Sequence, residues 1–157
     1  MSSPDEFAHF VGAQASVYDQ VLRELAAGCK YSHWMWFIFP QLRGLGHSQM
    51  SMRYAIESLE QARRYLAHEL LGTRLRECTT LVLNMQGTTA NDIFGGVDTL
   101  KFHSCVTLFS LCAPPKNVFA KAIAKYFAGT PDANTLRILD IERQRPGERR
   151  DQDRETR

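Results

Sequence analysis

A short segment of the chain surrounds a cluster of aromatic residues with polar ones. This segment, KYSHWMWFIFPQLRGLGHS, spans residues 30–48 and holds both tryptophans of the protein. Lys30 can attract an anion, and His33 can exchange a proton near neutral pH. Trp34 or Trp36 can stack on a planar ring. These residue types suit a small anionic or nucleotide-like molecule, such as a phosphorylated compound.

The same segment continues with an amide and two glycines. Gln41 lies at the far edge of the aromatic run and is a candidate ligand contact. Gly44 and Gly46 would let the backbone approach a ligand closely, because glycine has no Cβ. A tight turn with positive φ would explain the same glycines without any ligand.

A second segment, DTLKFHS at residues 98–104, carries a complementary polar set. Asp98, Lys101 and Ser104 recur at every third position along one side of a predicted helix that is otherwise apolar. An unpaired buried polar group costs about 1–3 kcal/mol, so the two polar sets could satisfy one another. Lys30, Lys101 and the helix N-terminus near Asp98 would then form a corner that attracts an anion.

A structural role explains these residues equally well. Asp98 would cap the helix and pair with Lys101, and Ser104 would bond to a backbone carbonyl, while His33 would donate to a neighbouring helix end. Two hypotheses therefore stay open. One is a ligand-binding domain, and in its hydrolase version His33 and Asp98 are the catalytic residues. The other is a protein-interaction module without catalytic activity.

Composition predicts one folded domain. The chain has 157 residues, of which 44% are hydrophobic and 23% are charged, as in ordinary globular proteins. No apolar run reaches the roughly 20 residues of a membrane-spanning helix, and the start is acidic, so we expect a cytoplasmic protein. No motif indicates a cofactor. The four cysteines lack metal-ligand spacing and favour reduced, buried thiols: Cys29, Cys78, Cys105 and Cys112.

The end of the chain differs from the rest. We divide the sequence into a helical domain at residues 1–141 and a charged tail at 142–157, which we expect to be disordered. The net charge of the protein is only +2, and in the tail arginines alternate with acidic residues. Such a tail neutralises phosphates poorly, which argues against nucleic acid as a partner. The sequence does not indicate an oligomeric state.

Hydrophobic periodicity predicts an all-α fold with six or seven helices. No segment alternates with period two, whereas apolar residues recur every three or four positions along most of the chain. The longest predicted helices span residues 4–27, 50–67 and 70–87. The aromatic run, which is apolar on every face, predicts a short buried helix capped by Ser32. Asp98 is expected to cap the helix that follows Gly95-Gly96.

Four stretches together resemble one protein family. They are KYSHWMWFIFPQLRGLGHS, YAIESLEQARRYLAHELLGTRL, IFGGVDTLKFHSCVTLF and YFAGTPDANTLRIL, and the similarity runs from about Phe7 to Leu139. In this order they resemble the DUF1810 family of bacteria and fungi. The resemblance implies an all-helical fold with buried central helices, and it implies no activity. Glu69 departs from the family's usual proline, and Val97 and Thr99 depart from its usual residues beside Asp98.

Overall fold

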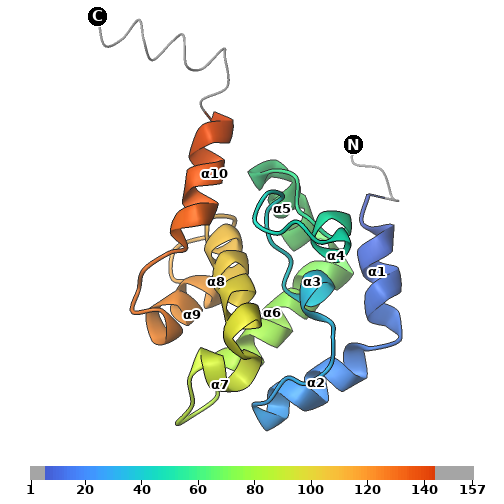
Figure 1. Ribbon diagram of the computed structural model, residues 1–157, viewed down its shortest axis with the longest axis vertical. Helices are drawn as coiled ribbons and strands as arrows, with labels where there is room; N and C mark the ends of the chain where they lie inside the picture. The colour runs from blue at the N-terminus through green and yellow to red at the C-terminus, as the bar shows by residue number, and fades with distance from the viewer. Residues whose placement is uncertain (1–5, 144–157) are drawn as a thin grey trace, which may run out of the picture.

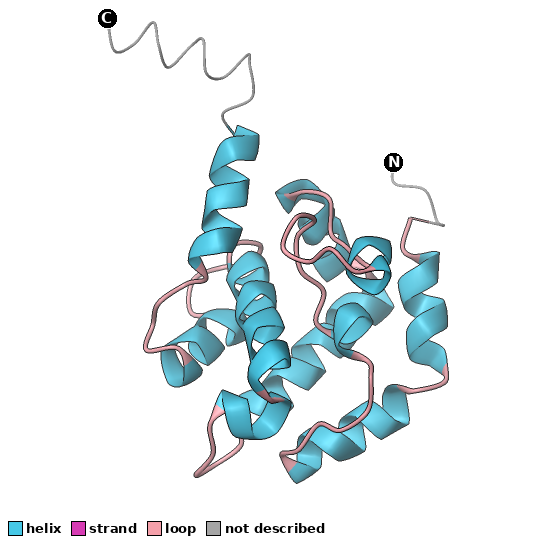
Figure 2. Ribbon diagram, viewed as in Figure 1, coloured by secondary structure: helices cyan, strands magenta, loops and turns pink. Residues whose placement is uncertain are grey.

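The fold consists of helices joined by short loops. The structure is a computed structural model that describes residues 6–143, and these residues contain ten helices and no strand (Figures 1 and 2). The helices are α1 Ala8–Ala15, α2 Tyr18–Ala27, α3 Met35–Ile38, α4 Gln49–Arg53, α5 Leu59–Ala67, α6 Glu69–Leu83, α7 Ala90–Phe94, α8 Gly96–Ser110, α9 Val118–Tyr126 and α10 Ala133–Arg143. The all-α prediction is confirmed, and the prediction of six or seven helices is wrong.

One extra helix arises because the predicted helix at 4–27 is broken. α1 ends at Ala15 and α2 begins at Tyr18. Between them Val17 leaves helical geometry, with φ −123° and ψ −8°. The break turns the chain, so that α1 runs along one edge of the molecule and α2 passes beneath it (Figure 1). Apolar residues recur with the 3.6-residue helical period on both sides of the break, so the sequence pattern predicted one continuous helix.

The predicted helix at 50–67 is also divided. Ile56 lies in an extended stretch and forms an isolated parallel bridge with Leu42. Its N–H donates to the Gln41 carbonyl at 2.9 Å, which leaves it unavailable to a helix. A new helix, α5, then starts after Ser58, whose hydroxyl accepts the Gln61 N–H. This serine is an N-cap signal that the hydrophobic pattern outweighed in the prediction.

The core lies around α6 and α8. α8 packs against α9, α5, α7 and α10, and α6 packs against α5, α9 and α2 (Figure 1). In α8 the run from Phe102 to Phe109 is buried apart from His103, as expected for a central helix. Aromatic rings fill the space between α3 and α8, where Phe39 meets Phe102 edge to face at 5.1 Å. The predicted short buried helix is present as α3.

Two predicted caps are wrong. Trp34, not Ser32, precedes α3, and no side chain caps this helix. Gly95, not Asp98, precedes α8. Its φ of +82° is not helical, so this one residue separates the end of α7 from the start of α8. Asp98 therefore lies within the first turn of α8, where a carboxylate is stabilised by the helix dipole.

Two other expectations concern the ends of the chain and the thiols. The tail at 142–157 lies outside the described residues, apart from positions 142 and 143 in α10.

None of the described helices is long and apolar enough to span a bilayer. Cys78 and Cys105 are buried as predicted, whereas Cys29 is exposed.

Candidate functional site

The two polar segments meet at Asp98. Its carboxylate accepts an ion pair from Lys30 with Nζ–Oδ2 2.7 Å, and Lys101 Nζ lies 3.6 Å from Oδ1. Lys30 belongs to the loop after α2, and Lys101 is one turn beyond Asp98 on α8. We call these residues, with Trp34 and Trp36, the lysine–tryptophan corner. The convergence of Lys30, Asp98 and Lys101 agrees with the sequence prediction.

Lys30 is the buried member of the corner. Its side chain is 6% exposed, and Nζ also donates to the Ser32 carbonyl at 2.6 Å. The ammonium lies 4.9 Å from the Trp34 ring centroid, within range of a cation–π contact. The backbone N–H of Lys30 donates to the Ile93 carbonyl at 2.7 Å. Lys30 thus ties the loop to α7 and α8.

Lys101 is less constrained. Its side chain is 17% exposed, and the 3.6 Å separation from Asp98 exceeds a normal hydrogen bond. Asp98 is the one acidic group within ion-pair distance of Lys101 in the described part of the chain. The ammonium lies 6.0 Å from the ring centroid of Trp36, which is half-buried. Lys101 therefore keeps hydrogen-bonding capacity next to a partly accessible indole.

Trp34 belongs to the core. It is 1% exposed, and its indole N–H donates to Glu24 Oε1 at 3.1 Å. A ring in this position packs against protein atoms on all sides and has no face to offer a ligand. Of the two tryptophans, only Trp36 can stack on a ligand at the surface without a change in the core.

A buried carboxylate, Glu24 of α2, organises the loop beneath the corner. The side chain is 1% exposed, and Oε1 accepts the backbone N–H groups of Tyr31 and Ser32 at 2.8 and 3.0 Å. Oε2 accepts the Gln20 amide at 2.8 Å. Burial by itself would raise the pKa of Glu24, but hydrogen bonds from Ser32, Gln20 and Tyr31 outweigh it and lower the pKa to about 2. Glu24 therefore stays ionised and holds the loop.

Ser104 serves a different part of the fold. Its hydroxyl oxygen lies 3.0 Å from the Leu100 carbonyl oxygen and 3.2 Å from Asp132 Oδ2, so its single proton is shared between two acceptors. Asp132 precedes α10 and accepts the Thr135 N–H and hydroxyl at 2.9 and 2.6 Å. Ser104 is buried, and its contact with Asp132 stabilises the start of α10. Its contact with a backbone carbonyl agrees with the structural explanation. Ser104 makes no hydrogen bond to Lys30 or Lys101.

Gly44 and Gly46 have local roles, and the Gln41 side chain lies next to Gly46. A Cβ on Gly46 would lie 2.5 Å from Ser51 Oγ and 3.3 Å from the Gln41 amide nitrogen, so the absent side chain makes room for protein atoms. Gly44 has φ +101°, a conformation that favours glycine. A Cβ on Gly44 would lie 3.5 Å from the Ile138 side chain of α10. A tight loop explains both glycines.

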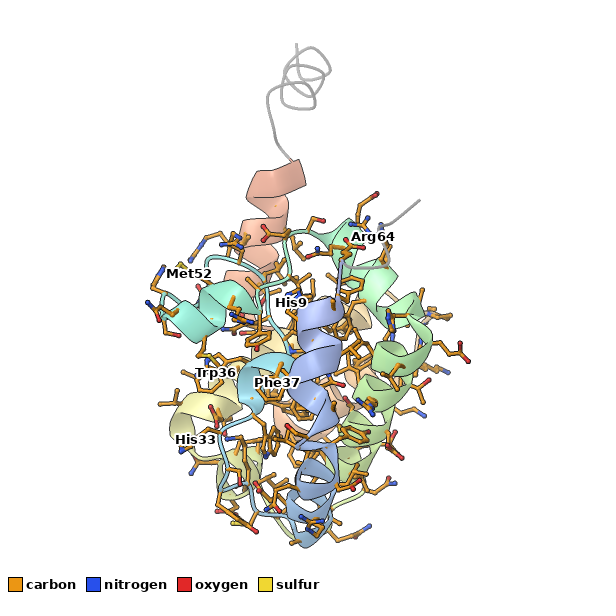
Figure 3. All side chains as sticks on the ribbon, turned by 90° about the vertical axis from the view of Figure 1, so that its right-hand side faces the viewer. His9, His33, Trp36, Phe37, Met52 and Arg64 are labelled. Atoms are coloured by element: carbon orange, nitrogen blue, oxygen red, sulfur yellow. The ribbon has the colours of Figure 1, made fainter. Side chains whose placement is uncertain are left out.

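His33 lies at the surface. Its side chain is exposed, and it makes no hydrogen bond or ion pair within residues 6–143. His33 and Trp36, three residues apart, point to the same side of the molecule in Figure 3. The predicted donation from His33 to a helix end is therefore not seen, and its side chain is available to other molecules.

Comparison with known proteins identifies the family of this chain. A family model described as "Protein of unknown function (DUF1810)" matches residues 4–139. The chain belongs to the DUF1810 family. It is similar to the conserved hypothetical protein Rv1873 from Mycobacterium tuberculosis, whose crystal structure aligns with a TM-score of 0.85 at 49% identity. The alignment covers 88% of this chain and 99% of that one. No curated protein matches.

Sequence reasoning missed the residues that complete the polar structure of this DUF1810 protein. Glu24 follows Val21 by three positions on the buried face of α2, and a charged residue on an apolar face was the available signal. The prediction also missed Tyr18 and Arg74, which line a groove between α2 and α6 away from the corner. Their positions in the sequence gave no motif, since the two residues are 56 positions apart.

Proposed function

We propose that this DUF1810 protein binds a small anionic molecule with a planar ring, such as a nucleotide, at the exposed side of the lysine–tryptophan corner. The observation that carries the proposal is the position of Asp98 between two ammonium groups, at 2.7 Å from Lys30 and 3.6 Å from Lys101. The two ammonium groups share this one carboxylate, and the more distant one, on Lys101, keeps hydrogen-bond donors for a phosphate or carboxylate.

The two lysines would contribute differently. Lys30 already uses its ammonium on Asp98 and the Ser32 carbonyl, and it is almost fully buried. Lys101 lies beyond hydrogen-bond distance of Asp98 and retains donors for an incoming anion. Lys101 is therefore the proposed ligand contact, whereas Lys30 fixes the carboxylate that orients it.

Trp36 and His33 support the ring-binding part of the proposal. Trp36 is half-buried and close to Lys101, so a planar ring could stack on it while the anion meets the ammonium. His33 is exposed on the same side of the molecule (Figure 3). The hydrolase version, with His33 and Asp98 as catalytic residues, stays a prediction. In the structure the carboxylate of Asp98 is already paired with Lys30.

A protein-interaction module is the second candidate, and exposed apolar residues favour it. Val97 and Leu100, one turn apart on α8, are 69% and 67% exposed, and Tyr31 in the adjoining loop is 70% exposed. Large exposed apolar side chains near one another are a feature of interaction surfaces. A protein partner would cover Val97 and Leu100, whereas a small molecule at Lys101 would not need them.

Tryptophan fluorescence tests the proposal directly, because the chain has two tryptophans and only Trp36 is partly accessible. We would titrate the full chain with AMP, adenosine and inorganic phosphate. AMP is expected to quench the emission saturably, with an affinity about tenfold or more above that of adenosine or phosphate alone. In Trp36→Phe, which leaves only the buried Trp34, most of the quenching should disappear.

The controls separate the two candidates. Lys121, an exposed lysine on α9, provides the matched variant Lys121→Met, which should bind AMP like the wild type. Val97→Ser with Leu100→Ser should also leave the titration unchanged but should abolish capture of any protein partner. Equal binding of AMP by wild type and Lys101→Met, or no saturable quenching at all, would refute the ligand proposal.

A further inference from the structure

A second polar site lies between α2 and α6, away from the corner. It is an open groove with a volume of about 620 Å³, lined by Tyr18, His68, Glu69, Leu70, Thr73, Arg74 and Glu77. The two helices pack side by side, and α6 flanks α1 and α2 in Figure 3. A volume of this size is in the range of small-molecule sites. The groove is independent of Lys101 and Trp36.

Arg74 is held in a defined orientation in this groove. Its Nη1 donates to Gln14 Oε1 at 3.2 Å, and its guanidinium carbon lies 4.4 Å from the Tyr18 ring centroid. Gln14 is buried and is fixed in turn by the Phe37 carbonyl at 2.8 Å and the Tyr65 hydroxyl at 3.4 Å. The guanidinium is therefore oriented before any ligand arrives, which lowers the entropic cost of binding.

Arg74 also lacks a carboxylate partner. No acidic group lies within ion-pair distance of it in the described range 6–143. A guanidinium has five N–H donors, and the bond to Gln14 uses one of them. The remaining planar set matches a carboxylate.

Two carboxylates line the same groove without a cationic partner. Glu77 accepts the hydroxyl of Tyr18, and neither Glu77 nor Glu69 forms an ion pair within the described chain. Burial raises the pKa of Tyr18, so its hydroxyl stays protonated and keeps donating to Glu77. Glu77 retains its second oxygen as an acceptor. The groove thus presents separate positive and negative groups that do not neutralise each other.

We infer that the α2–α6 groove binds a zwitterion of the amino acid or short-peptide class, whose carboxylate meets Arg74 and whose ammonium meets Glu77. Leu70, which is 36% exposed, adds an apolar contact for a side chain. A purely anionic ligand would be repelled by the two glutamates, and a purely cationic one by Arg74. A ligand that carries both charges satisfies both sets.

Titration of the ¹⁵N-labelled full chain tests this inference. We would follow amide shifts while adding L-leucine, the dipeptide Leu-Leu, acetate or methylammonium, each up to about 50 mM, well above a millimolar dissociation constant. Either zwitterion should give saturable shifts at Leu70 and Thr73, with an affinity about tenfold or more above that of acetate and methylammonium. Tighter binding of Leu-Leu than of L-leucine identifies a peptide, and the reverse order identifies a free amino acid.

Variants locate the charges that matter. Arg74→Met should weaken L-leucine binding by about tenfold or more, and Glu77→Gln should weaken L-leucine without weakening acetate. Arg63, an exposed arginine on α5, supplies the matched control Arg63→Met, which should bind as the wild type does. Should Arg74→Met fail to fold, Glu77→Gln decides, because its amide oxygen can still accept from Tyr18. Absence of saturable shifts, or equal binding by the wild type and Glu77→Gln, overturns the inference.

Discussion

The lysine–tryptophan corner and the α2–α6 groove use their charges in opposite ways. In the corner, Asp98 lies between Lys30 and Lys101, and its ion pair with Lys30 joins a loop to α8. In the groove, Arg74 and Glu77 line the same space without pairing. Charges that pair with each other hold the fold together, whereas charges that remain unpaired are available to another molecule. The corner combines both situations, because Lys30 is committed and Lys101 is not.

The largest loss of stability is expected on substitution of Glu24, whose carboxylate holds the loop beneath the corner. Glu24→Ala would leave two backbone N–H groups and the Trp34 indole N–H without their acceptor in a buried place. We expect a loss of about 3–5 kcal/mol in the free energy of unfolding. Urea unfolding measures it, and Glu60→Ala, at an exposed position of α5, is the control. A loss as small as that of the control would show that Glu24 does not organise the loop.

Lys30→Met should have the next largest effect. It removes the short ion pair to Asp98 and leaves that carboxylate with Lys101 at 3.6 Å. We expect a loss of about 2 kcal/mol, since the Lys30 side chain is only 6% exposed and water replaces the pair poorly. The same urea experiment checks it. A change below that of Lys121→Met would contradict the structural role of Lys30.

Arg74→Met sharpens the contrast between the two regions. It removes one hydrogen bond to Gln14 and the contact with the Tyr18 ring, but it breaks no ion pair. The expected loss is about 1 kcal/mol, smaller than for Lys30→Met. Thermal or urea unfolding of the two variants side by side measures the difference. A greater loss for Arg74→Met would mean that the groove, too, holds the fold through its charges.

A pH-dependent effect is expected from the ionisation of Glu24. Its pKa is about 2 in the folded protein against an ordinary 4.5, so the unfolded chain binds the proton first as the pH falls. The stabilisation is complete above pH 4.5 and is lost as the pH falls from about 4.5 towards 2. Urea midpoints at several pH values should show a smaller acid loss for Glu24→Gln than for the wild type. Parallel curves for the two proteins would contradict this assignment.

The sequence was sufficient to predict the fold class and one pairing in the site. Spacing on α8 and the position of Lys30 beside the aromatic run led to the prediction that Lys30, Asp98 and Lys101 converge, and the distances agree. This worked because polar groups in apolar surroundings need partners. The helix breaks at Val17 and Ile56 were missed, because tertiary hydrogen bonds and backbone geometry overrode a continuous apolar period, and because the N-cap signal of Ser58 was outweighed by that period.

Other site residues could not be placed from the sequence, because their partners are distant along it. Ser104 is hydrogen-bonded to Asp132, 28 positions away, and Gln14 is hydrogen-bonded to Arg74, 60 positions away. Trp34 and Trp36 are nearly adjacent, yet Trp34, which precedes the short helix α3, is buried, and Trp36, which lies within it, is half-buried. An aromatic run that is apolar on every face contains no signal that distinguishes them.

The central claim is that Lys101 contacts a ligand while Lys30 maintains the fold. The most direct test measures AMP affinity and the free energy of unfolding for the wild type, Lys30→Met and Lys101→Met under one set of conditions. Lys101→Met should bind AMP about tenfold or more weakly and lose less than about 1 kcal/mol of stability, whereas Lys30→Met should lose about 2 kcal/mol. Unchanged AMP binding by Lys101→Met, with a stability loss equal to that of Lys30→Met, would contradict the claim.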